Sequence, residues 1–188
     1  MLYIQTPVTN SPKFIEMQHM TLKRFVKDDY KFIVYNDAKD WPEFSNHYDS
    51  TVRKEIMKTC ERLNIQCINL PNEHHRIPGS NASDRNADSC NIILNDQIKN
   101  NEKSFMIDSD MFIVDEVNIC EKYADYDMAV VMQERKNLHV EKYNKVMDVE
   151  YFWPGLAYFD IPNMKNKHLL NWNGLGGRCG RTDAGGET

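Results

Sequence analysis

Residues 103–114 read KSFMIDSDMFIV, and this stretch decides the fold class. The apolar run 105–107 is typical of a buried parallel strand, and Asp108 and Asp110 follow it directly with one small residue between them. Side chains two residues apart in extended backbone point the same way, so both carboxylates can bind one cation, or one can bind the cation and the other a ligand hydroxyl. Two hard oxygen ligands that leave coordination positions open suit Mg²⁺ or Mn²⁺. The same residues could instead form a solvated turn that ends a strand.

The chain before this stretch alternates strand and helix patterns. Apolar runs bounded by turn formers predict strands at residues 2–8, 31–35 and 65–70. Helical spacing of apolar residues predicts helices at 12–26, from a cap at Asp49 or Ser50 to Leu63, and at about 82–99. With the strand before Asp108, this order predicts parallel strands joined by right-handed crossovers. We therefore expect an α/β fold with a Rossmann-like, mostly parallel sheet flanked by helices.

The remaining chain carries weaker patterns. Apolar segments at 127–132 and 155–159 predict two more strands, and the rest is loop-like and rich in glycine towards the end. The 188 residues fit one domain. We expect a ligand-binding half over 1–110 and a second half over 111–188.

Composition excludes several classes of protein. The formal net charge of −5 argues against binding nucleic acid by bulk charge. The sequence has no run of 18 apolar residues that could span a membrane. Its N-terminus lacks the positively charged segment with which a signal peptide begins. The five cysteines form no Cys-x-x-Cys pair, which favours buried thiols in a reducing compartment over disulfides or zinc ligands. These features predict a cytoplasmic protein.

Ligands of such sheets gather beyond the carboxyl ends of the strands. The polar residues there are Thr6, Asn36, Asp37 and the Asp108–Asp110 segment. His74 and His75 are adjacent in a polar stretch, where extended backbone would point them in opposite directions; we expect a solvated loop there rather than a metal site.

Several other motif families do not fit. An EF-hand loop starting at Asp108 would need Gly and Glu where Ile113 and Ile119 stand, and no phosphate-binding GxxxxGK[ST] or dinucleotide-binding GxGxxG occurs. A haloacid-dehalogenase-type phosphatase also begins with an apolar strand and Asp-x-Asp. There, however, a small hydroxyl residue usually follows, whereas Met111 follows here.

The strand order, Asp108-Ser109-Asp110 and the later segment 153–159 (WPGLAYF) resemble a GT-A-fold glycosyltransferase. The layout is most similar to small glycogenin-like and galactosyltransferase-like enzymes and to glycosyltransferase domains of giant algal viruses. The resemblance implies transfer of a sugar from a nucleoside-diphosphate sugar, most simply a UDP-sugar, to a glycan or protein-linked sugar acceptor. It also implies that Asp110 binds Mn²⁺ or Mg²⁺ and that Asp108 contacts either the metal or the ribose of the donor.

The resemblance assigns further roles on the donor side. Arg85 stands at the start of the helix before Asp108, where relatives place a basic residue aimed at the donor phosphate or sugar. The other implied donor-binding residues, which frame the base and ribose or accompany the aspartates, are Thr6, Pro7, Val8, Tyr35, Asn36, Asp37 and Ser109.

On the acceptor side the chain departs from its relatives. Many have Asn-Ala-Gly where this chain has Trp153-Pro154-Gly155, so a sugar-contacting asparagine is missing and Trp153 either stacks on an acceptor sugar or packs in the core. Asp183, with Gly185 and Gly186, resembles the acidic glycine-rich segment that closes the reaction centre, which makes Asp183 the candidate base.

Other interpretations stay open. Relatives often carry a further histidine ligand near the C-terminus, and none follows His168, so that ligand is missing or the chain is a piece of a longer protein with further domains. A sugar nucleotidyltransferase would need a glycine-rich basic loop after the first strand, and residues 6–10 provide neither feature. A binding module for nucleotide sugars without catalytic activity is the third alternative.

Overall fold

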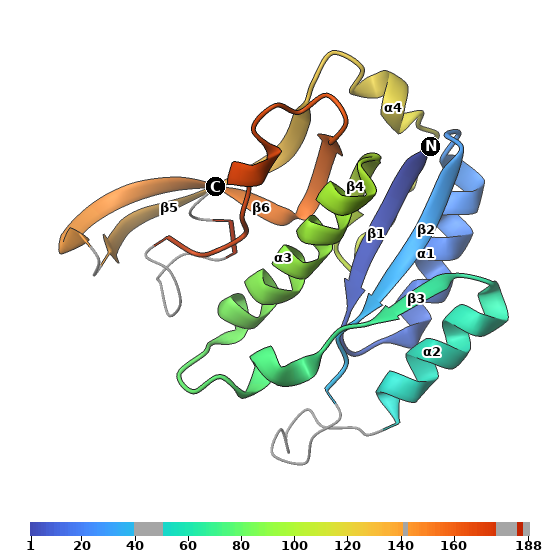
Figure 1. Cartoon of the computed structure of the whole chain (residues 1–188), viewed down its shortest axis with the longest axis horizontal. Coiled ribbons are helices and arrows are strands. Elements are labelled where there is room, and N and C mark those ends of the chain that lie inside the picture. Colours follow the sequence, from blue (N-terminus) through green and yellow to red (C-terminus); the bar gives the residue numbers. More distant parts are fainter. Residues whose placement is uncertain (40–50, 141–142, 176–183, 186–188) are drawn as a thin grey trace.

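The computed structural model describes residues 1–39, 51–140, 143–175 and 184–185. One six-stranded sheet, in the order β3-β2-β1-β4-β6-β5, forms the centre of the molecule (Figure 1). The strands are β1 (Leu2–Val8), β2 (Tyr30–Asn36), β3 (Gln66–Asn69), β4 (Lys103–Ile107), β5 (Met128–Val140) and β6 (Lys145–Asp160). The helices are α1 (Pro12–Phe25), α2 (Val52–Leu63), α3 (Ala82–Asn100) and α4 (Ile119–Lys122), with short 3₁₀ turns η2 (Asn72–Arg76) and η4 (Lys167–Leu169).

Strands β1 to β4 are parallel, as the apolar runs predict. Crossover helices α1, α2 and α3 connect them, so the predicted α/β fold with a mostly parallel, helix-flanked sheet is confirmed. Helix α2 begins after Thr51, which occupies the N-cap position that we expected for Asp49 or Ser50; those two residues lie outside the described part of the chain.

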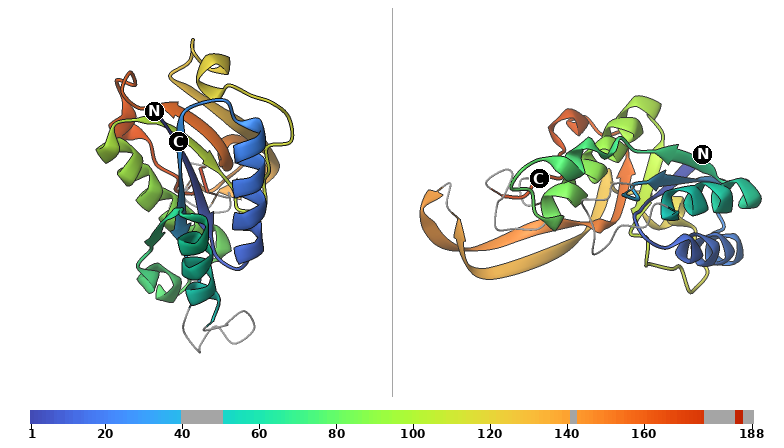
Figure 2. Two further views of the ribbon diagram at one scale, coloured as in Figure 1. Left: turned by 90° about the vertical axis from the view of Figure 1, so that its right-hand side faces the viewer. Right: turned by 90° about the horizontal axis from the view of Figure 1, so that it is seen from below.

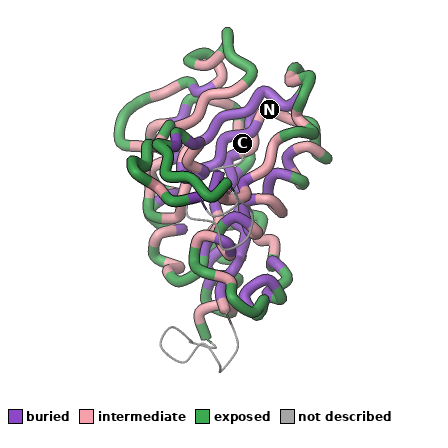
Figure 3. The backbone as a smooth tube through the Cα atoms, turned by 90° about the vertical axis from the view of Figure 1, so that its left-hand side faces the viewer, coloured by how far each residue is buried: buried purple, intermediate pink, exposed green. Residues whose placement is uncertain are grey.

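Two apolar clusters cover the two faces of the sheet. Alternate side chains of β2 enter opposite clusters: Phe32 and Val34 join the side of α1 and α2, and Ile33 and Tyr35 join the side of α3. Figures 1 and 2 show α1 and α2 together on one side and α3 on the other. Most residues of the central strands are correspondingly buried (Figure 3). Burial on both faces explains why these strands read as continuous apolar runs.

Strands β5 and β6 form a long antiparallel hairpin, with β6 antiparallel to β4. Its far end projects away from the body of the molecule (Figure 2, right). The predicted strands at 127–132 and 155–159 cover only the inner part. The outer part is mostly exposed and polar. A small cluster of the buried Val140, Val149 and Tyr151, with Leu138 and Leu175 packed against it, supports this part, but no continuous apolar run marks it in the sequence.

An irregularity interrupts β6 beside the carboxyl end of β4. Val130 pairs with Ala157 while the next residue, Val131, pairs with Trp153, so the segment 154–156 bulges out of the ladder with β5. A Cβ atom on Gly155 would lie 2.2 Å from the Trp153 indole, so glycine is what allows this ring to fold over the bulge. Among the described residues, no helix combines the length and apolar content needed to cross a membrane.

Candidate active site

The carboxyl ends of β1, β2 and β4 bring the predicted polar residues to one edge of the sheet. Asp37 follows β2, and its backbone N–H donates to the carbonyl of Val8 at the end of β1, at 2.8 Å. Burial, the charge of Asp108 and the charge of Asp37 all raise the pKa of the Cys90 thiol on α3. Both carboxylates therefore lie close enough to α3 to act on the same side chain.

Backbone hydrogen bonds fix Asp108 at the end of β4. Its N–H donates to the carbonyl of Gly155 in the β6 bulge at 2.8 Å, and its carbonyl accepts from the N–H of Met111 at 3.1 Å, which closes a turn. Its Oδ1 accepts from the N–H of Ser109 at 2.8 Å. Asp110 on this turn is exposed to solvent.

The two carboxylates of this turn repel one another. Burial raises the pKa of Asp108, and the negative charge of Asp110 raises it further. A divalent cation would relieve both effects, and carboxylate oxygens are the ligands that Mg²⁺ and Mn²⁺ prefer. The residues present therefore fit such an ion.

Gln18 on α1 supports this turn and was not among the predicted site residues. Its side chain is fully buried, and Nε2 donates to the carbonyls of Asp108 at 2.8 Å and Met111 at 3.1 Å. One sequence signal could have revealed it: Gln18 is a polar residue on the helix face that carries Ile15 and Leu22.

A cavity of about 210 Å³ opens beside Asp37. Its lining residues come from the ends of β1 and β2, from η2 and from the first half of α3: Pro7, Thr9, Asp37, Lys39, His75, Ala82, Arg85, Asn86 and Ser89. Burial and the nearby positive charge of Arg85 lower the pKa of Lys39, so two cationic groups face this cavity together. Such a pair suits an anionic ligand such as a phosphate.

Some of the predicted donor-binding residues line this cavity, and others do not. Pro7, Asp37 and Arg85 share the wall of this cavity. Thr6 and Val8 are buried in β1 and do not line it. The Tyr35 hydroxyl donates to Asp96 and accepts from Gln5, and Asn36 donates to Asn69 at 2.9 Å, so both side chains serve internal hydrogen bonds.

Asp37, His74, His75 and Ser89 form a buried polar cluster at one wall of the cavity. His74 Nε2 lies 3.1 Å and His75 Nε2 lies 3.0 Å from Asp37 Oδ1, and the Ser89 hydroxyl donates to Oδ2 at 2.6 Å. Burial alone would raise the pKa of Asp37, but hydrogen bonds from these three side chains lower it on balance. Burial likewise opposes protonation of His74, and the contacts with Asp37 outweigh it and raise its pKa.

Our expectation of a solvated loop with diverging histidines is wrong. His74 and His75 are 8% and 5% exposed, and their ring centroids lie 4.1 Å apart. The reason is local: residues 72–76 form the 3₁₀ turn η2, in which adjacent side chains do not alternate as they do in a strand.

The predicted acceptor-side residues are only partly within the described chain. Trp153 is half-buried over Gly155. Gly185 is buried with φ +96°, its N–H donates to the carbonyl of Trp172 at 2.8 Å, and a Cβ atom there would lie 1.8 Å from the carbonyl oxygen of Phe152. Asp183 and Gly186 lie outside the described residues.

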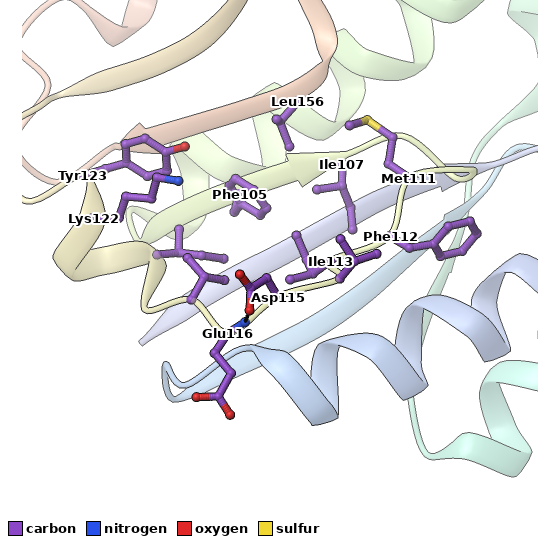
Figure 4. A pocket seen from close by; sticks show the side chains of 13 residues that line it. Phe105, Ile107, Met111, Phe112, Ile113, Asp115, Glu116, Lys122, Tyr123 and Leu156 are labelled. Carbon is purple, nitrogen blue, oxygen red and sulfur yellow. Dashed lines mark hydrogen bonds between the residues drawn. The ribbon is translucent and has the colours of Figure 1, made fainter.

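A second cavity, of about 370 Å³, lies on the opposite face of the sheet. Apolar side chains from β4 and from the segment after Asp110, including Phe105, Ile107 and Phe112, line most of it (Figure 4). Its charged groups, Asp115, Glu116 and Lys122, lie along the segment 115–122. This arrangement offers no converging set of catalytic groups, so the site at the carboxyl edge is the better candidate.

Comparisons with known proteins find glycosyltransferase structures of low similarity. TarS of S. aureus is 19% identical at a TM-score of 0.40 over 65% of this chain and 19% of its own. The mannosyltransferase PcManGT from Pyrobaculum calidifontis, in complex with GDP-Man and Mn²⁺, is 14% identical at 0.46 over 85% of this chain and 44% of its own. Core-mannan synthase A from Aspergillus fumigatus, in an Mn/GDP form, is 11% identical at 0.46 over 85% of this chain and 59% of its own.

This chain thus spans less than two thirds of each of these structures. No family model and no curated protein sequence matches it. Similarity at this level concerns backbone arrangement and assigns no activity, so the function has to be argued from the site itself.

Proposed function

We propose that this chain is a metal-dependent glycosyltransferase that moves a sugar from a nucleoside-diphosphate sugar, most simply a UDP-sugar, to a hydroxyl of a glycan or protein-linked sugar. One observation carries the proposal: a carboxylate pair at the end of β4 and a cavity faced by Lys39 and Arg85 share the carboxyl edge of the sheet. A nucleotide diphosphate needs this combination, because its negative charge requires both a cation and basic side chains.

On the donor side, Asp108 and Asp110 would hold Mn²⁺ or Mg²⁺ through their carboxylate oxygens. When bound, this ion neutralises charge that grows on the leaving diphosphate. Arg85 and Lys39 would add positive charge to the same region and so stabilise the leaving group further. The wall formed by Pro7 and Asp37 is suited to receive the nucleoside part.

On the acceptor side, residues 111–188 would bind the hydroxyl acceptor. An inverting reaction needs a carboxylate that takes the proton of the acceptor hydroxyl, and Asp183 is the proposed base. Trp153 would offer its ring face to a pyranose.

The proposed location is the cytoplasm. The four described cysteines, Cys60, Cys67, Cys90 and Cys120, are free thiols, as expected for a reducing compartment.

The test is release of nucleoside diphosphate from a panel of UDP- and GDP-sugars, with and without Mn²⁺ and with simple sugars as acceptors. We expect Mn²⁺-dependent release that falls about 100- to 1,000-fold in Asp110→Ala, because one stabiliser of the leaving charge is lost. Asp125→Ala, which removes another exposed carboxylate, is the matched control and should retain full activity.

Two other outcomes would replace the proposal. Nucleotide-sugar binding without any turnover, hydrolysis included, would identify a binding module. Pyrophosphate release from a nucleoside triphosphate and a sugar phosphate would identify a nucleotidyltransferase.

A further inference from the structure

The cluster of Asp37, His74 and His75 has the dimensions of a metal site. One possible ligand atom from each of the three buried residues lies within 4.8 Å of the other two. For a tetrahedral zinc ion with bonds of about 2.0–2.2 Å, two ligand atoms are separated by about 3.4 Å. The distances of 3.1 Å and 3.0 Å from the two Nε2 atoms to Asp37 Oδ1 are within a few tenths of an ångström of that value.

The two imidazoles converge on one oxygen of a buried carboxylate. His74 and His75 are 8% and 5% exposed, and the Nε2 atoms of both rings face Asp37 Oδ1. An imidazole nitrogen that carries no proton is a metal ligand, and so is a carboxylate oxygen. The three side chains therefore bring three ligand atoms to one point inside the protein.

Ser89 holds the carboxylate of Asp37 in place. Its hydroxyl has one hydrogen, and its shortest contact is the 2.6 Å bond to Asp37 Oδ2, against 3.0 Å to the carbonyl of Arg85 and 3.3 Å to His74 Nε2. A ligating carboxylate in a metal site is commonly held by such an outer hydrogen bond, which fixes its orientation.

We propose that Asp37, His74 and His75 form a binding site for a divalent transition metal of the Zn²⁺ class, separate from the cation site at Asp108 and Asp110. Two imidazole nitrogens and one carboxylate suit Zn²⁺ or Co²⁺, whereas Mg²⁺ and Ca²⁺ prefer an all-oxygen set. The Ser89 hydroxyl, bonded to Oδ2, orients the carboxylate so that Oδ1 faces the metal.

The site would fasten the turn η2 to the end of β2. Asp37 and His75 also line the 210 Å³ cavity, so a coordination position beyond the three protein ligands can be filled from that cavity by water or by an oxygen of a bound ligand. This inference does not rest on the proposed glycosyltransferase activity, and its test needs no nucleotide sugar.

The test is titration of the chelator-treated, untagged full chain with Co²⁺ in excess Mg²⁺, which keeps the Asp108–Asp110 site filled. We expect one tight equivalent of Co²⁺ with the visible absorption band of a four-coordinate ion, and loss of that band when Zn²⁺ is added. In the wild-type chain, ¹⁵N NMR of the imidazoles should show Zn²⁺ shifting Nε2 of two histidines. This second measurement needs no variant and so does not depend on a mutant folding.

Variants then assign the ligands. His74→Gln and Asp37→Asn should each weaken Co²⁺ binding at least 100-fold, because loss of even an outer-shell partner costs about 10- to 100-fold. His168→Gln, an exposed histidine on η4, and Asp110→Ala should bind Co²⁺ as the wild type does. No Co²⁺ band in Mg²⁺, unshifted imidazoles, or equal loss of binding in Asp110→Ala would overturn the inference.

Discussion

Gln18 connects helix α1 to the turn that carries Asp108 and Asp110, and replacing it tests how that turn is held. Its Nε2 makes two hydrogen bonds, to the carbonyls of Asp108 and Met111, at 2.8 and 3.1 Å. Gln18→Met keeps the length and approximate volume of the side chain but removes both donors. The carbonyl of Asp108 still accepts a hydrogen bond from the N–H of Met111, so the loss of a donor affects the carbonyl of Met111 most.

The magnitude follows from these contacts. Each buried hydrogen bond contributes about 0.5–1.5 kcal/mol net, so two of them give roughly 2 kcal/mol. The Oε1 atom of Gln18 is buried without a hydrogen-bond partner among the described residues. Removing this atom offsets part of the loss in stability. For a chain of this length, about 2 kcal/mol corresponds to a fall in Tm of roughly 4–8 °C.

The assay combines urea unfolding with Mn²⁺ affinity. Gln18→Met should lower the free energy of unfolding by the stated amount and weaken Mn²⁺ binding, because the turn that positions the carboxylates is less fixed. Lys13→Met places the same side chain at an exposed position of α1 and should change stability by no more than about 0.5 kcal/mol. If both variants matched the wild type in Tm and in Mn²⁺ affinity, the supporting role of Gln18 would be refuted.

Three further changes have defined outcomes. Gly185→Ala should cost about 2–4 kcal/mol in urea unfolding, because φ is +96° and the new Cβ would meet the Phe152 carbonyl; an unchanged stability would contradict this packing. Asn81→Ala should cost about 1 kcal/mol, because the Asn81 side chain accepts from an N–H in the first turn of α3, and Asn81→Ser should restore most of it. Cys67 should react with iodoacetamide ahead of the other three described cysteines. A hydrogen bond from Cys60 and the charge of Arg53 lower its pKa, although burial opposes them. Peptide mapping by mass spectrometry gives the order of reaction, and another cysteine reacting first would contradict this prediction.

The parallel half of the fold is predictable from the sequence because both faces of its sheet are buried. A strand such as β4 then reads as a continuous apolar run, and its end is marked by Asp108. The outer hairpin is not predictable in the same way. Residues 134–139 of β5 are mostly exposed and pair with β6, and Leu138 is the residue among them that packs against the small cluster around Val149. One apolar residue in six gives no periodic pattern that would predict a strand.

The candidate site, too, could be predicted only in part from the sequence. Asp37 and Arg85 could be placed at one edge because strand ends and helix starts meet there. The convergence of His74 and His75 on Asp37 could not be foreseen, because it depends on η2 being a 3₁₀ turn rather than extended chain. Gln18 was missed because its partners are backbone carbonyls about 90 residues away, which no local motif encodes.

The measurement that tests the central claim most directly is calorimetric titration of the chain with UDP and GDP, each with and without Mn²⁺. The account predicts binding of at least one nucleoside diphosphate that requires Mn²⁺, weakens at least 10-fold in Asp110→Ala and is unchanged in Asp125→Ala. Failure of both nucleotides to bind, or binding that is indifferent to both Mn²⁺ and Asp110, would contradict a donor site at the carboxyl edge of the sheet.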